Sequence, residues 1–261
     1  MSPVFLALVL AAAADAGGGA VFGPGEQITY QVSWLGLHAG EGQVTVGAES
    51  PERPGLWPIV TMGKSDVALF PIKQKIVVWW DPATSRSREL DLYAEEGKHR
   101  FRKRIEFQPE ASHARYTYLE EGKPAQIKDH TVSPDAVDAA AAVFNLRTRR
   151  LAVGDEISFP IVTGPKVFQG HATVLEKVNI DTPLGNRPVV LVRLRTEFAG
   201  KLAARELRMW FSDDPAHVPM RMEADFAIGP VVVEWTDYQP GKAIRPSSLA
   251  SGGATLPGKP P

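Results

Sequence analysis

The residues that could bind a metal or move protons are few and scattered. No two of the six histidines stand four residues apart, and none joins a run of Asp or Glu, so no single segment predicts a metal site. A site assembled across several strands stays open. Cysteine is absent, which excludes disulfides, thiolate ligands and a cysteine nucleophile. We therefore expect no metal and no cofactor. The histidines are His38, His99, His113, His130, His171 and His217.

One pair of carboxylates, Asp213-Asp214, has the composition of an acid–base pair. It precedes Pro215 between two strand-like runs, where Asp usually bonds its own backbone in a turn. We interpret it as a turn. The chain also lacks the G-x-S-x-G, P-loop and G-x-G-x-x-G motifs, so Ser65-Asp66 has no nucleophile elbow around it. The sequence favours a protein without enzymatic activity over an uncharacterised hydrolase.

A basic run, KHRFRKR, spans residues 98–104. It has two interpretations: a solvated strand face whose long side chains cover apolar surface, or a contact with anionic lipid or another acidic partner. The whole chain has a formal net charge of −1, so we expect no nucleic-acid binding. The residues that would make the anionic contact are Lys98, Arg100, Arg102 and Arg104.

Large apolar side chains are the remaining candidates for a binding site. In Val218–Phe226, Met and Phe alternate with Arg, Glu and Asp, so the apolar face must cover something away from water. That face either packs into the core or lines an open trough, because wide β structures can hold a ligand in their mouths. The candidate ligand-binding residues are Trp34, Phe70, Trp80, Met220, Met222 and Phe226.

The elements that must position these residues are mostly strands. Residues 205–239 divide into three strands separated by Asp-Pro and Gly-Pro breaks, a pattern typical of neighbouring antiparallel strands. Gln74–Trp80 is apolar on both faces, which predicts a central strand covered on both sides. We expect one large curved antiparallel sheet, a half-barrel or open barrel.

One helix is predicted, over Ser133–Leu146. Ser133 is a suitable N-cap and Pro134 suits the first helical position. An apolar stripe at helical spacing (Val137, Ala140, Ala141 and Phe144) would lie against the sheet. The arginines that follow it, Arg147 among them, would complement the helix dipole.

The two ends of the chain differ from the middle in composition. Residues 1–16 have an apolar run followed by Ala14-Asp15-Ala16, typical of a secretory signal cleaved after Ala16. The alternative is an uncleaved membrane anchor, although the run is short for a span. We expect a flexible segment at 17–24, one β-rich domain at 25–240 and a disordered Gly/Pro/Ser-rich tail at 241–261.

Three stretches resemble the bacterial family called domain of unknown function 3108. They are GEQITYQVSWLGLHAGEGQVTV, AAVFNLRTRRLAVGDEISFPI and MWFSDDPAHVPMRMEADFAIGPVVVEWTDYQ. The resemblance implies a signal-bearing cell-envelope protein of Gram-negative bacteria, with no catalytic residues to transfer. It also suggests similarity in shape to the periplasmic lipoprotein-carrier (Lol-type) half-barrel, whose concave side could receive acyl chains.

Together these observations favour a periplasmic protein that binds a hydrophobic ligand or a lipidated partner. The competing hypothesis is an interaction or scaffold module for envelope assembly with a fully packed interior.

Overall fold

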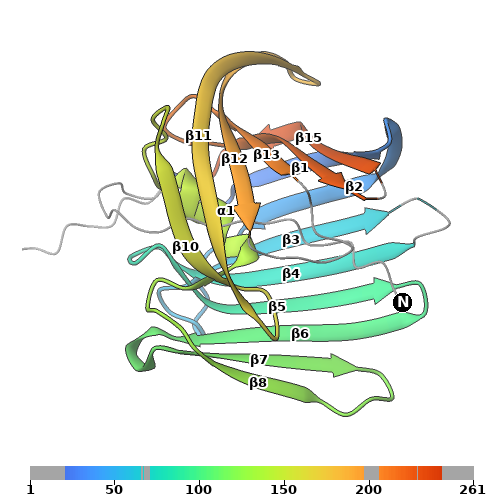
Figure 1. The fold of residues 1–261 in the computed structure, drawn as a ribbon, viewed down its shortest axis with the longest axis vertical. Helices are drawn as coiled ribbons and strands as arrows, with labels where there is room; N and C mark the ends of the chain where they lie inside the picture. The colour runs from blue at the N-terminus through green and yellow to red at the C-terminus, as the bar shows by residue number, and fades with distance from the viewer. Residues whose placement is uncertain (1–20, 66, 68–70, 197–205, 228, 243–261) are drawn as a thin grey trace, which may run out of the picture.

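The structure is a computed structural model of the 261-residue chain, and it describes residues 21–65, 67, 71–196, 206–227 and 229–242. Fifteen strands form one curved sheet, and the described residues contain a single α-helix (Figure 1). This confirms the expected fold class. The elements are β1 (Gln27–Trp34), β2 (Leu37–Val46), β3 (Trp57–Ser65), β4 (Ile72–Asp81), β5 (Arg86–Glu96), β6 (His99–Gln108), β7 (His113–Glu120), β8 (Gln126–Thr131), β9 (Val137–Asp138), α1 (Ala139–Arg147), β10 (Glu156–Val162), β11 (Val167–Thr182), β12 (Gly185–Thr196), β13 (Glu206–Ser212), β14 (Pro219–Phe226) and β15 (Gly229–Gln239).

The sheet is a meander whose first and last strands meet in the middle. Strand β1 pairs with β2 on one side and with β15 on the other, and the edges of the sheet are β8 and β9. Every pairing is antiparallel except the short one between β9 and β10. The two edge strands follow each other along the chain, so the sheet curls into an open barrel (Figure 1).

The helix begins later than the sequence predicts. Ser133 does not cap it, because Val137 and Asp138 form β9 first. The Asp138 carboxylate instead accepts hydrogen bonds from the amides of Ala140 (2.7 Å) and Ala141 (2.9 Å), which gives a well-formed N-cap. Residues 140–147 are all buried. The helix therefore fills the interior of the curved sheet, and does not present an exposed side.

The main core lies between the concave face of the sheet and α1. Phe22 packs against Trp80 (6.0 Å between ring centroids) and Phe144 (4.9 Å). Phe22 is 1% exposed, so the described end of the segment predicted to be a flexible N-terminus is packed instead. The predicted signal and most of the predicted tail lie outside the described residues.

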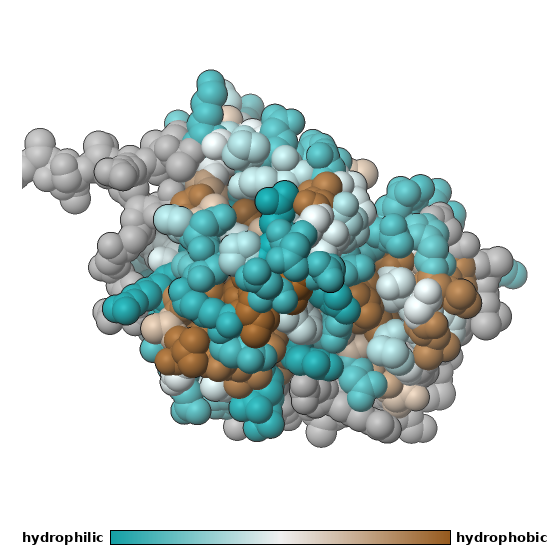
Figure 2. Space-filling view, turned by 90° about the horizontal axis from the view of Figure 1, so that it is seen from above, coloured by the Kyte–Doolittle hydropathy of each residue, from teal (hydrophilic) through white to brown (hydrophobic). Residues whose placement is uncertain are grey.

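A second core forms on the opposite face of the sheet, around Trp210 and Trp235. The long β11–β12 hairpin, which curls over the top of the molecule in Figure 1, contributes Leu175, Val178 and other side chains to it. Figure 2 shows this end of the molecule from above, where polar side chains cover most of the surface and apolar patches lie between them.

The alternation in the sequence predicts that Met220 and Met222 point to the same face of the sheet, and this prediction is wrong. The pairing of β13 with β14 shifts register between Trp210 and Phe211, which leaves Met220 as an extra residue. A bulge of this kind changes the side to which the strand's side chains point. Met220 consequently joins the second core, whereas Met222 and Phe226 pack against the main one.

Candidate functional site

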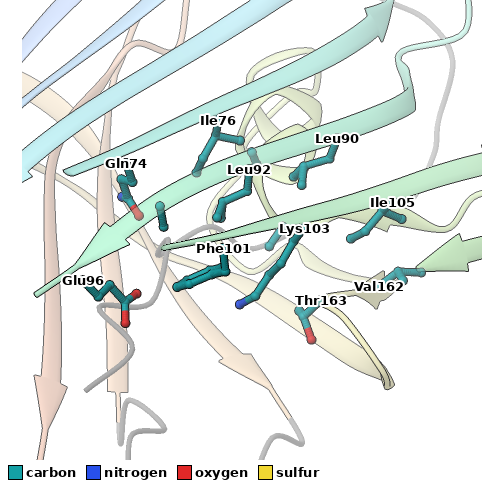
Figure 3. A pocket seen from close by; sticks show the side chains of 13 residues that line it. Gln74, Ile76, Leu90, Leu92, Glu96, Phe101, Lys103, Ile105, Val162 and Thr163 are labelled. Atoms are coloured by element: carbon teal, nitrogen blue, oxygen red, sulfur yellow. The ribbon is translucent and has the colours of Figure 1, made fainter. Parts of the chain in front are cut away.

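A pocket opens on the concave face of the sheet, where β4, β5 and β6 pass under the start of α1 and the end of β10 (Figure 3). Its volume is ≈ 80 Å³, small beside the ~300–1,000 Å³ of pockets for drug-sized ligands. Its walls are mostly apolar, which suits a narrow hydrophobic ligand. The apolar lining comprises Ile76, Leu90, Leu92, Ala94, Phe101, Ile105, Ala139, Ala140 and Val162.

Four polar residues line the same pocket: Gln74, Glu96, Lys103 and Thr163. In Figure 3, Glu96 and Lys103 lie on either side of Phe101. The Lys103 ammonium lies over the Phe101 ring, 5.1 Å from its centroid, a favourable cation–π arrangement. The pocket thus combines apolar walls with one acidic and one basic group.

Burial shifts the pKa of both ionisable groups toward neutrality. Removal from water raises the pKa of Glu96, and the nearby charges of Lys103 and His99 oppose that rise. Removal from water lowers the pKa of Lys103, against the opposing effect of Glu96. Each shift has the sign that burial gives to an ionisable group.

The regular alternation of β5 and β6 positions these groups. Leu92 and Lys103 are cross-strand partners, and the next partners in register alternate between the two faces. Lys103 therefore shares its face with Phe101 and Ile105, a pattern visible in the sequence. Along β5, every second residue from Leu90 to Glu96 lines the pocket, and Glu96 is the last of them. Neither charged residue is among the predicted ligand-binding residues, because that prediction rested on large apolar side chains alone.

The residues predicted to bind a ligand are spread over the molecule. Trp80 is fully buried in the main core, Met220 lies in the second core, and Trp34 is half-buried at the end of β1. Phe70 lies outside the described residues. Of the described candidates, including Met222 and Phe226, none lines the pocket in Figure 3. The apolar face of β14 packs on core residues and does not form a wall of this pocket.

The basic run on β6 is matched by acidic residues on β5. Arg102 contacts Asp91 at 2.7 Å, and Arg104 contacts Glu89 at 2.6 Å. Arg100 approaches Glu95 at 3.6 Å, and Lys98 is an exposed residue beside the β5–β6 turn. These cross-strand pairs offset most of the positive charge that the sequence suggests. A contact with an anionic surface stays a prediction.

Asp213-Asp214 forms the turn that the sequence predicts. The Asp214 carboxylate accepts hydrogen bonds from the Ser212 hydroxyl (2.9 Å) and the Ala216 amide (2.8 Å). Asp213 instead pairs with Lys177 at 2.6 Å. The two carboxylates are thus used separately, each with its own partner.

A serine and a histidine do meet on the surface. Ser158 Oγ lies 2.8 Å from His171 Nδ1 on neighbouring strands, and both residues are exposed. In the described part of the chain, no carboxylate is hydrogen-bonded to His171 and neither residue lines the pocket. A nucleophile–base–acid arrangement is therefore incomplete there. The described residues also contain no group of three or more His, Asp or Glu placed to hold a metal ion.

A bidentate ion pair that the sequence did not reveal lies at the seam between β1 and β15. Arg147, at the end of α1, donates two hydrogen bonds to Glu26, both 2.7 Å long. Both side chains are almost completely buried. The Tyr238 hydroxyl donates to Glu26 and Arg147 Nε donates to the carbonyl of Ala216. This pair ties the helix to the sheet.

No helix in the described residues is long and apolar enough to cross a membrane.

One solved structure shows similarity to this chain at the level of the fold. A β-barrel-like protein of the domain of unknown function DUF1849 from Brucella abortus superimposes with a TM-score of 0.57 and 8% sequence identity. The match covers 83% of this chain and 98% of that one. A protein with a YmcC-like fold from Bacteroides fragilis gives a TM-score of 0.37 at 10% identity, over 84% of this chain and 99% of that one.

No curated protein matches the sequence. A family described as "Protein of unknown function (DUF3108)" matches residues 29–236. That range includes nearly all of the sheet, α1 and the residues lining the pocket. The chain belongs to the DUF3108 family.

Proposed function

We propose that this protein is a non-enzymatic component of the bacterial cell envelope that binds a hydrophobic ligand, a single acyl chain, in the pocket beneath α1. The observation that carries the proposal is the pocket itself. It has apolar walls from strands and helix and a few polar groups, the usual composition of a ligand site. Its small volume favours one chain over a lipid with two.

The hydrophobic effect alone can drive such binding. Each buried methylene contributes about 0.8 kcal/mol, so each group of three methylenes that the pocket takes up would contribute roughly 2 kcal/mol before the cost of ordering the chain. No catalytic group is needed for this. Ile76, Leu92 and Ala140 would supply much of the contact surface.

The envelope location rests on the amino-acid sequence. Residues 1–16 have the apolar run and the A-x-A pattern of a secretory signal. The absence of cysteine is compatible with an oxidising compartment, because the two hydrophobic cores replace disulfides as the source of stability. We place the mature protein in the periplasm, where acyl chains and lipidated proteins are available as ligands.

A scaffold module with a packed interior is the second candidate. The observation that favours it is the burial of Phe22, Trp80 and Phe144 side by side under the sheet, which leaves most of the concave face filled. In this alternative, the pocket is a packing defect and the exterior strands carry the function.

Native mass spectrometry of the intact protein separates the two. We expect the delipidated protein to take up one molecule of dodecanoic acid or of its uncharged relative dodecanol. Thr163→Trp, placed at the exposed rim of the pocket, should reduce that uptake. Thr131→Trp, at another exposed position on the edge strand β8, is the matched control. Uptake of neither ligand by the original protein, or equal uptake by both variants, would favour the scaffold.

A further inference from the structure

We infer that the ligand of this pocket is a long-chain carboxylic acid, whose head group lies between Lys103 and Glu96 while its chain extends along the apolar wall toward α1. This inference rests on the proposed function and adds the chemical class of the ligand. It depends on the two charged side chains, because the apolar walls alone would accept any hydrocarbon chain.

Glu96 is the first part of the argument. Its side chain lines the pocket and the residue is 8% exposed. Among the residues that the structure describes, its Oε2 atom has no hydrogen-bond partner. A buried polar atom without a partner costs about 1–3 kcal/mol, so native proteins rarely keep one without a reason. A ligand that hydrogen-bonds to this oxygen would remove the cost.

Lys103 is the second part. Its stem crosses the apolar face of β6 and its ammonium approaches the face of Phe101. Within the ranges that the structure describes, no carboxylate forms a salt bridge with it, and it does not pair directly with Glu96. Each of these two groups is therefore available to a third group in the pocket.

Glu120, the cross-strand partner of Phe101, cannot serve as that third group. Glu120 already accepts hydrogen bonds from Tyr118 (2.9 Å) and contacts Lys123 (2.7 Å) and His99 (3.3 Å). Those contacts hold the pKa of Glu120 at about 2. Both of its oxygens thus already have partners, whereas one Glu96 oxygen has none among the described residues.

A carboxyl head group matches the two side chains better than other lipid head groups do. One of its oxygens can accept a charge-assisted hydrogen bond from the Lys103 ammonium. Its other oxygen can share a proton with Glu96, as paired carboxyl groups do. A cationic head group would be repelled by Lys103, and a phosphate would place excess negative charge beside Glu96. An alcohol can satisfy both groups only weakly because it carries no charge.

The test compares dodecanoate with dodecanol and methyl dodecanoate, by competition against a fluorescent acyl probe on the full chain. We expect dodecanoate to bind about 10- to 100-fold more tightly than dodecanol, the difference that one charge-assisted hydrogen bond provides. Lys103→Met, which keeps an apolar stem, should weaken dodecanoate binding far more than dodecanol binding and so remove this preference. Lys103→Arg should restore part of it.

Glu96 has its own matched variants. Glu96→Gln keeps a hydrogen-bonding group and should retain binding of the acid, whereas Glu96→Leu should weaken binding of the acid more than binding of dodecanol. Circular dichroism of each variant confirms that it is folded. Arg100→Met, on the opposite face of β6, is the control and should change nothing.

The outcomes separate the two proposals. If no chain binds, the proposed function fails and the inference fails with it. If dodecanol and the methyl ester bind as tightly as dodecanoate, and Lys103→Met has no effect, the ligand site stands and the assignment to carboxylic acids is overturned.

Discussion

The buried pair of Glu26 and Arg147 should be the most sensitive point of the fold. Arg147→Met removes the guanidinium and leaves the Glu26 carboxylate, which has 1% side-chain exposure, without its main partner. Breaking a buried ion pair in this way costs about 3–5 kcal/mol, because an uncompensated charge stays in the core. For a domain of this size, that corresponds to a melting temperature lowered by about 6–20 °C.

The double variant Glu26→Leu/Arg147→Met should recover part of that loss, since it removes both charges together. Recovery cannot be complete. The Tyr238 hydroxyl and the Ala216 carbonyl both lose hydrogen bonds to the pair, and each unsatisfied buried group costs about 1–3 kcal/mol. We expect the double variant to be more stable than either single variant.

Urea unfolding followed by tryptophan fluorescence measures these differences, because Trp80 lies near the pair through Phe22. Lys177→Met, which removes the exposed contact with Asp213, is the control and should change stability little. The reasoning is refuted if Arg147→Met is as stable as this control, or if the double variant loses the sum of the two single losses.

Three further predictions concern single residues. Asp138→Ala should lower the free energy of unfolding by about 0.5–2 kcal/mol, because the helix loses its N-cap. Asp138→Asn should lower it less. Equal unfolding free energies for the two variants would contradict the capping role. Burial lowers the pKa of His217, so the unfolded chain binds this proton more readily and stability should fall as the pH drops below about 6.5. His217→Asn, which tolerates the left-handed backbone (φ 40°), should flatten that decline in pH-dependent unfolding; an unchanged slope would exclude His217 as its source. Burial raises the pKa of Glu96, so its ionised form disfavours folding as the pH rises. Glu96→Gln should therefore raise the melting temperature at pH 8. A lower melting temperature would show that Glu96 stabilises the fold as a charge.

The strands were largely predictable because each carries its own local signal. Alternation in Met222–Phe226 and the breaks on either side define β14 without reference to any other element. The position of Met220 was not predictable, since it depends on a bulge set by pairing with β13. A single extra residue there moves one large side chain from the main core to the second one.

The helix start and the buried pair depended on contacts between distant segments. Ser133-Pro134 is a good local start for a helix, but Val137 pairs with Ile161 of β10, and this tertiary contact delays the helix until Asp138 caps it. Glu26 and Arg147 are 121 residues apart. Nothing in either local sequence indicates that Arg147, the last residue of the helix, is buried.

Part of the pocket lining could be predicted from the sequence. The alternation of β6 already places Lys103 among apolar neighbours, and that inconsistency with an exposed strand face was the available signal. Whether the inward side of β6 meets solvent or a cavity depends on how Ala139 and Ala140 lie over it. That packing is a property of the whole sheet.

The measurement that tests the central claim most directly is methyl NMR of alanine-labelled protein titrated with dodecanoate. Ala94, Ala139 and Ala140 line the pocket, whereas Ala114 and Ala224 are buried elsewhere in the same core and serve as internal controls. We predict intermolecular NOEs from the acyl chain to the first three methyls and none to the two controls. NOEs confined to Ala224, or no methyl perturbation at saturating ligand, would contradict the account.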